Sequence, residues 1–108
     1  MSTCNCKQII IKLRQGDDSN YNSNHIIFHI GKPEEHDLTG WKAKFQLQNL
    51  TWNYDEIKNN QIELVVNQHQ TNSLDVGSCY GWLQLIDNEG KQGTVYTQPF
   101  KILRREVF

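Results

Sequence analysis

Apolar and polar residues alternate in short runs along most of this chain, and each run is stopped by a turn signal. The clearest run is 41–48, in which every second residue is apolar: Trp41, Ala43, Phe45 and Leu47. A repeat of two residues places the apolar set on one face of a β-strand and the polar set on the other. No helical stripe of period 3.6 continues beyond about two turns. The sequence therefore predicts an all-β protein.

Turn residues separate seven such segments, and a polar stretch at 67–74 predicts a single helical turn. Asp87 to Gly90 is a hairpin signal, with Gly90 suited to a positive φ. Seven short strands at this spacing are typical of a Greek-key sandwich. We expect an Ig-like antiparallel β-sandwich with one domain over 8–108, preceded by a flexible tail at 1–7. The predicted strands span about 8–14, 24–30, 41–48, 50–54, 62–66, 78–86 and 94–103.

Within the first predicted strand, alternation places Ile9, Ile11 and Leu13 on the inward side. Lys58-Asn59-Asn60 is the expected turn after the fourth strand. Over all strands we expect about eighteen inward side chains in one shared core, each worth about 1.5–3 kcal/mol on full burial.

The charge balance argues against several classes of partner. Net charge is −1, with 11 basic and 12 acidic residues spread evenly along the chain, so we expect no basic face and no nucleic-acid partner. The longest apolar runs have three residues, as in Ile9 to Ile11, which excludes a membrane-spanning helix and a signal-peptide apolar region. From the Met-Ser-Thr start we expect a native cytosolic beginning.

Three cysteines and a histidine pair are the candidate metal ligands. Cys4 and Cys6 form a C-x-C pair without a second pair, whereas a structural zinc site needs four ligands. Cys79 lies at an inward position of a predicted strand, and we expect a buried thiol there and three reduced cysteines. His25 and His29 share a strand face about 13 Å apart, at about 3.3 Å per residue, so they cannot bind one metal. We predict two solvated histidines and no metal site.

The acidic residues of the loops do not form a recognisable site. Their spacing lacks the alternating oxygen ligands and terminal bidentate acid of a calcium loop. No Ser-His-Asp or Cys-His arrangement is visible. We therefore predict no catalytic residue, no cofactor and no enzymatic activity. The acidic residues considered are Asp17, Asp18, Glu34, Glu35 and Asp37.

The sixth predicted strand carries large side chains on its outward positions. If Cys79, Gly81, Leu83 and Leu85 face the core, then Tyr80, Trp82 and Ile86 face outward. Large apolar side chains on an outer strand face often mark an interface, and Trp and Tyr are enriched at binding hot spots. A reversed register or a covering loop would remove this candidate interface. Stacking of the same aromatic groups on sugar rings is a further alternative.

Several segments, taken in order, resemble a known family. The succession resembles the small β-sandwich modules of phage and prophage tail and baseplate proteins, including baseplate upper proteins, over about 9–103. Outward Trp82 is a departure, since such modules often carry a small or acidic residue there. The segments are Ile11-x-Leu13-x-Gln15-Gly16-Asp17, Asp37-Leu38-Thr39-Gly40-Trp41-Lys42-Ala43-x-Phe45, Ile62-x-Leu64, Thr71-x-x-Leu74-x-x-Gly77, Leu83-Gln84-Leu85-x-Asp87-x-x-Gly90 and Phe100-x-Ile102.

This resemblance implies a non-enzymatic structural part of the virion, made in the bacterial host cytoplasm and located in the tail or baseplate. It implies a homo-oligomer, a ring or trimer, that contacts other tail or baseplate proteins, with no nucleic-acid or membrane partner. The alternative function is a carbohydrate-binding module for host-surface adhesion, with Trp82 and Trp52 as the candidate sugar platforms.

Overall fold

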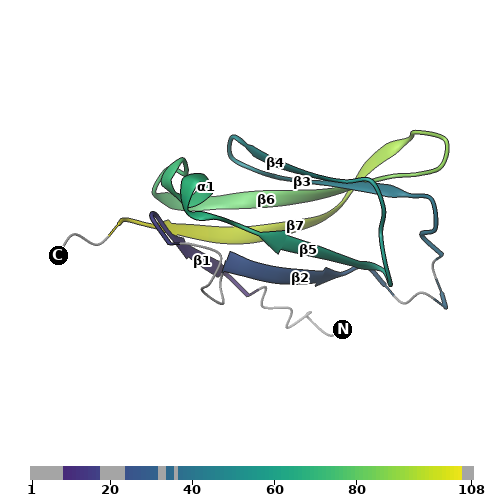
Figure 1. Ribbon diagram of the computed structural model, residues 1–108, viewed down its shortest axis with the longest axis horizontal. Coiled ribbons are helices and arrows are strands. Elements are labelled where there is room, and N and C mark those ends of the chain that lie inside the picture. Colours follow the sequence, from purple (N-terminus) through teal and green to yellow (C-terminus); the bar gives the residue numbers. More distant parts are fainter. Residues whose placement is uncertain (1–8, 18–23, 32–33, 36, 106–108) are drawn as a thin grey trace, which may run out of the picture.

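The computed structural model describes residues 9–17, 24–31, 34–35 and 37–105. In this part of the chain it contains seven strands and one short helix, arranged in two layers (Figure 1). The predicted tail at 1–7 lies outside the described residues. The elements are β1 (Ile11–Arg14), β2 (His25–His29), β3 (Lys42–Leu47), β4 (Leu50–Tyr54), β5 (Gln61–Val65), α1 (Gln68–Asn72), β6 (Gly77–Ile86) and β7 (Gln92–Leu103).

The strands form a five-stranded sheet in the order β1-β7-β6-β3-β4 and a two-stranded sheet of β2 and β5. This confirms the predicted all-β, sandwich-like fold. One pairing departs from the antiparallel prediction, because β1 runs parallel to β7 with Ile11 opposite Phe100. Only strands joined by a tight hairpin must be antiparallel. Nearly the whole chain separates β1 from β7, so their relative direction is not constrained by a turn.

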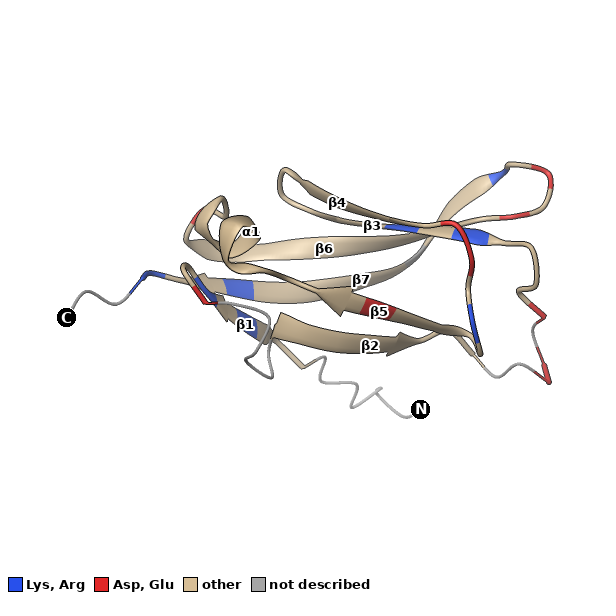
Figure 2. Cartoon of the chain, viewed as in Figure 1, with Lys and Arg blue, Asp and Glu red and all other residues tan. Residues whose placement is uncertain are grey.

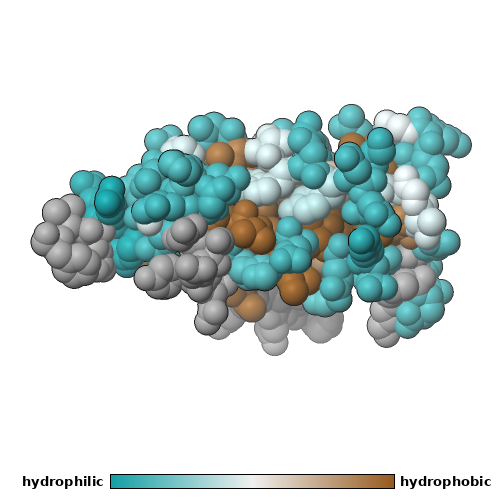
Figure 3. All heavy atoms as spheres, in the orientation of Figure 1, coloured by the Kyte–Doolittle hydropathy of each residue, from teal (hydrophilic) through white to brown (hydrophobic). Residues whose placement is uncertain are grey.

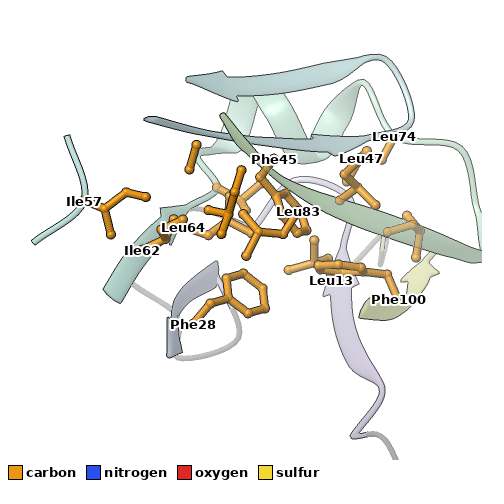
Figure 4. Packing of buried hydrophobic residues seen from close by; sticks show 14 of the residues in the cluster. Leu13, Phe28, Phe45, Leu47, Ile57, Ile62, Leu64, Leu74, Leu83 and Phe100 are labelled. Carbon is orange, nitrogen blue, oxygen red and sulfur yellow. The ribbon is translucent and has the colours of Figure 1, made fainter. Parts of the chain in front are cut away.

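Alternation along the strands builds the core between the two layers. In β3, Ala43, Phe45 and Leu47 are buried, and each faces an inward residue of β6 or β4. Phe45 lies at the centre, with ring centroids 5.2 Å from Phe28 of the small sheet and 6.1 Å from Phe100 of the large one (Figure 4). Because these rings come from both sheets, Phe45 couples the two layers.

The turns before β5 and β7 form where the sequence predicts them. Asn59 and Asn60 both have φ of 53°, and Gln61 N–H donates to the Lys58 carbonyl at 2.9 Å, as in a type I′ turn. Gly90 has φ of 84° and its N–H donates to the Asp87 carbonyl at 3.0 Å. The expected helical turn is α1. Within the described residues, no helix has the length and apolar character needed to cross a bilayer.

Two strand ends differ from the prediction. The first strand starts at Ile11 rather than near residue 8, and the Ile9 side chain is 80% exposed instead of inward. Ile9 precedes the ladder with β7, so no neighbouring strand holds its side chain over the core. The last strand starts at Gln92, two residues early, and the register of its pairing with β6 shifts between Leu83 and Gln84. That β-bulge lets β7 continue along the full length of β6.

One lateral seam of the sandwich is closed by side chains of β4. The Trp52 indole donates to the Val65 carbonyl at 3.1 Å, and the Tyr54 hydroxyl donates to the Glu63 carbonyl at 2.7 Å. Both acceptors lie on β5, an edge strand whose carbonyls would otherwise lack a partner on that side. These two bonds tie the edge of the large sheet to the edge of the small one.

Candidate functional site

Among the described residues, the most exposed aromatic side chains lie on β6, the central strand of the large sheet. Tyr80 and Trp82 are 61% and 49% exposed, and they point away from the core. The predicted alternation of β6 is therefore confirmed, and the alternative of a reversed register is wrong. Ile86 faces the same way but is half-buried. Of the three candidate interface residues, two adjacent aromatic groups offer a substantial free surface.

The strand register shows which side chains surround these two rings. Tyr80 lies opposite Pro99 on β7, and Trp82 lies between Thr97 on β7 and Gln46 on β3. Residues directly opposite each other in a ladder share a face of the sheet. We call the outer surface of the five-stranded sheet, centred on Tyr80 and Trp82, the aromatic face.

Gly81 explains why this part of β6 lies so close to the core. A Cβ at this position would come within 2.9 Å of the Phe100 ring and still closer to the Phe45 ring. The missing side chain lets both rings pack directly under the backbone that carries Tyr80 and Trp82. The two aromatic groups therefore stand on a rigid, well-packed support.

Basic residues also gather on the aromatic face, which the even spread of charge along the sequence did not predict. Lys42 and Lys44 lie opposite Ile86 and Gln84, and Lys101 lies opposite Ser78. Figure 2 shows Lys and Arg on the strands of the large sheet and acidic residues mainly in loops. The signal was present in the sequence: the five strands of this sheet contain no Asp or Glu. The basic residues on this face are Lys12, Arg14, Lys42, Lys44 and Lys101.

An open apolar groove of about 810 Å³ lies on the side of the sandwich opposite the β4–β5 seam. It runs between β2 and the start of the described chain at Ile9 and Ile10, with Phe28, Leu83 and Tyr96 among its lining residues. Part of the apolar surface over β2 and β5 is seen as brown atoms in the centre of Figure 3. The floor of the groove consists of core side chains, so the groove is the gap between the edge of β1 and the edge of β2.

Among the other candidate metal ligands, the outward positions of the two histidines are confirmed. His25 and His29 are exposed on the outer face of β2, and His25 Nε2 lies 2.5 Å from the Glu63 carboxylate. Cys79 is only half-buried, against the prediction of a buried thiol, because it lies near the open end of β6 where Gln48 Nε2 donates to its Sγ at 3.6 Å. Cys4 and Cys6 lie outside the described residues. No group of three or more His, Cys, Asp or Glu converges within the described ranges.

Trp52 differs from Trp82 in its surroundings, although both were candidate sugar platforms. Its ring packs at a centroid distance of 6.0 Å from Phe45, and its indole N–H is used in the bond to β5. Burial, followed by the negative charge of Glu63, raises the pKa of the neighbouring Tyr54 to about 12. Both side chains therefore belong to the seam between the layers rather than to an accessible site.

No protein-family model matches this chain, and a search of curated proteins found no match. The function of this chain is therefore inferred from the fold and the surface chemistry described above.

Proposed function

We propose that this chain is a non-enzymatic structural protein of a phage or prophage particle that acts in tail or baseplate assembly through protein–protein contacts. The supporting observation is the aromatic face, where Tyr80 and Trp82 lie side by side, outward, on a rigid central strand. Exposed aromatic groups of this size are enriched at the centres of protein interfaces. The succession of sequence segments that resembles tail and baseplate modules supports a location in the virion.

In this proposal the chain is made in the bacterial host cytoplasm and becomes part of the tail or baseplate as a homo-oligomer, a ring or trimer. Its partners are further copies of itself and other tail or baseplate proteins, without nucleic acid or membrane. Repeated copies around a tail axis would require cyclic contacts.

Mass spectrometry of particles purified from the phage or prophage whose genome encodes the chain tests the setting. The expected result is the chain in intact particles at a fixed copy number relative to the tail proteins. Particles that lack it would overturn the proposed function.

The role of the surface is tested with the variant Tyr80→Ser/Trp82→Ser. Incorporation into particles should be lost while the unfolding midpoint stays near that of the wild type, because neither side chain is buried. The matched control is Ile27→Ser/Val65→Ser, which removes exposed apolar side chains from the small sheet, where Ile27 is 50% and Val65 38% exposed. Equal loss in both variants would argue against a specific role of the aromatic face.

The carbohydrate-binding alternative has less support, since only Trp82 of its two candidate platforms is an open surface. A glycan array with wild type and Trp82→Ala separates the two functions. Sugar binding that disappears in this variant would favour the alternative over assembly.

A further inference from the structure

The five-stranded sheet has an unusual charge distribution. Its strands carry five basic residues on the outer face and no acidic residue, although the whole chain has a net charge of −1. Lys101 and Lys44 lie in ladder rows on opposite sides of the Tyr80–Trp82 pair. The aromatic rings are therefore flanked by positive charge on both sides.

Two of these lysines repel each other. Lys12 on β1 lies directly opposite Lys101 on β7, and like charges in this arrangement destabilise a sheet. Both are exposed, and neither forms an ion pair with any described residue. A negatively charged partner would remove this repulsion, so the pair favours an anionic partner over a cationic one at this surface.

The opposite sign collects at one end of the same molecule. The connections β2–β3, β4–β5 and β6–β7 all lie at this end, because the start of β3 pairs with the ends of β4 and β6, and the start of β5 with the end of β2. Acidic residues at this end are visible at the right of Figure 2. We call this set the acidic end, and its described members are Glu34, Glu35, Asp37, Asp55, Glu56, Asp87 and Glu89.

Local hydrogen bonds hold two of these carboxylates in place. Asp37 accepts bonds from the Thr39 hydroxyl at 2.6 Å and the Thr39 N–H at 3.0 Å, which lowers the pKa of Asp37 and keeps it ionised. Asp87 accepts from the N–H groups of Glu89 and Lys91 at 2.8 and 2.9 Å. The acidic end is therefore a defined surface, and partly buried Trp41 beside it adds a small apolar area.

We propose that the acidic end of one copy binds the aromatic face of the next copy, head to tail. The inference rests on the proposed function and names the surfaces of its homo-oligomer. Both complementary charges are carried by one chain, which favours a second copy over an unrelated acidic protein. A nucleic-acid partner is disfavoured because the chain is slightly acidic, with a pI of about 6.4. Two different surfaces in contact form a ring if the rotation closes, and a filament if it does not.

Sedimentation equilibrium of the full chain at low and high salt tests the inference. We expect association at low salt that weakens as salt screens the charges. The variant Lys44→Glu/Lys101→Glu should weaken association about tenfold or more, because it reverses charge on both sides of the rings. The matched control Lys58→Glu/Lys91→Glu has the same net charge but changes loops of the acidic end, so it should not weaken association.

A charge-swap experiment decides whether the two surfaces meet. The variant Glu35→Lys/Glu56→Lys should also fail to associate alone, since it removes charge from the acidic end. Mixed with Lys44→Glu/Lys101→Glu, it should associate again, because each variant then offers the surface that the other has lost.

Three results would overturn the inference: a wild type that stays monomeric at millimolar concentration and low salt, association unchanged by Lys44→Glu/Lys101→Glu, or a mixture that fails to associate. A monomer whose lysines bind single-stranded oligonucleotide would assign the face to nucleic acid instead. If the chain is monomeric in solution but present in particles, the proposed function stands and this contact does not. If the chain self-associates but is absent from particles, the contact stands and the proposed function does not.

Discussion

At the scale of single residues, two positions show how the surroundings of a residue determine its role in packing. Gly81 is such a site, because two buried rings occupy the space of its missing side chain. Tyr54 is another, because its hydroxyl crosses from one layer to the other and its ring is half-buried. Neither residue has a role that its own chemistry would reveal without its neighbours.

Replacing Gly81 with Ala should lower the free energy of unfolding by about 1–3 kcal/mol, as is typical for overpacking a core. The added methyl group would collide with the Phe45 and Phe100 rings, which are 0% and 1% exposed and have no room to move. Urea denaturation measures the change. Gly93→Ala is the matched control on the neighbouring strand, with nothing within 4 Å of its Cβ, and should change stability by about 0.5 kcal/mol or less. Equal stability of the two variants would contradict this packing.

Tyr54 should give the protein an alkaline limit. Its pKa is raised to about 12 in the folded state, above the unfolded value of about 10, so the folded state favours the protonated phenol. This contribution to stability is complete below pH 10 and is lost as pH rises towards 12. Denaturant midpoints across this range, followed by phenolate absorbance, should reveal it. In Tyr54→Phe that part of the decline should be absent; an unchanged decline would assign it to other groups.

At the scale of elements, the two lateral sides of the sandwich differ. Side-chain bonds from β4 close one side, whereas an open apolar groove lies along the other side, between β1 and β2. The helix α1 strengthens the end near β1: buried Thr71 donates its hydroxyl to the Asp17 carbonyl at 2.9 Å and accepts from the Gly16 N–H at 3.1 Å. Specific polar contacts thus stabilise short elements, which have few backbone hydrogen bonds of their own.

Thr71→Val should lower the free energy of unfolding by about 1–3 kcal/mol, because the shape is kept while two backbone groups lose their partner. Thermal and urea denaturation measure this loss. Thr71→Ser keeps the hydroxyl and should retain most of the stability that Val removes. A Val variant as stable as the wild type would contradict the role of these hydrogen bonds, and a Ser variant less stable than Val would assign the site to methyl packing instead.

Strand β2 should show an alternating pattern of amide hydrogen exchange. Val66 donates to the Asn24 carbonyl and Ile30 to the Asn60 carbonyl, so the even-numbered residues of β2 bond to β5. The amides of Ile26 and Phe28 should exchange orders of magnitude more slowly than the odd-numbered amides, which point towards the free edge. Exchange measured by NMR on the full chain tests this. Uniform slow exchange along β2 would mean that another strand occupies that edge.

At the scale of the whole molecule, one core and one charge asymmetry dominate. The core lies between a five-stranded sheet and a two-stranded sheet. Two strands alone bury little apolar surface, so the stability of the small sheet depends on its packing against the large one. The asymmetry places acidic loops at one end and basic residues on the strands of the larger sheet. Stability therefore comes from contacts between the layers, and the association that we propose would depend on charges that those layers bring together.

Phe45→Ala should lower the free energy of unfolding by about 3–5 kcal/mol, the usual cost of removing a buried Phe. Its ring contacts Phe28, Trp52 and Phe100, so both layers lose packing at once. Denaturation followed by far-UV circular dichroism and by tryptophan fluorescence should give coincident transitions at a lower midpoint. Phe45→Leu should lose less, and separate transitions for the two probes would contradict a shared core.

The sequence by itself determined which residues face inward and where the chain turns, because a strand's repeat of two and the left-handed preference of Asn and Gly are local backbone properties. Ala43, Phe45 and Leu47 are buried and Gly90 turns as predicted. Tertiary structure alone decided that β1 runs parallel to β7 and that Ile9 lies outside the ladder. It also set Lys12 opposite Lys101, 89 positions away in the chain. Strand pairing depends on the packing of both layers together, and no local pattern of residues encodes which distant strand becomes the neighbour.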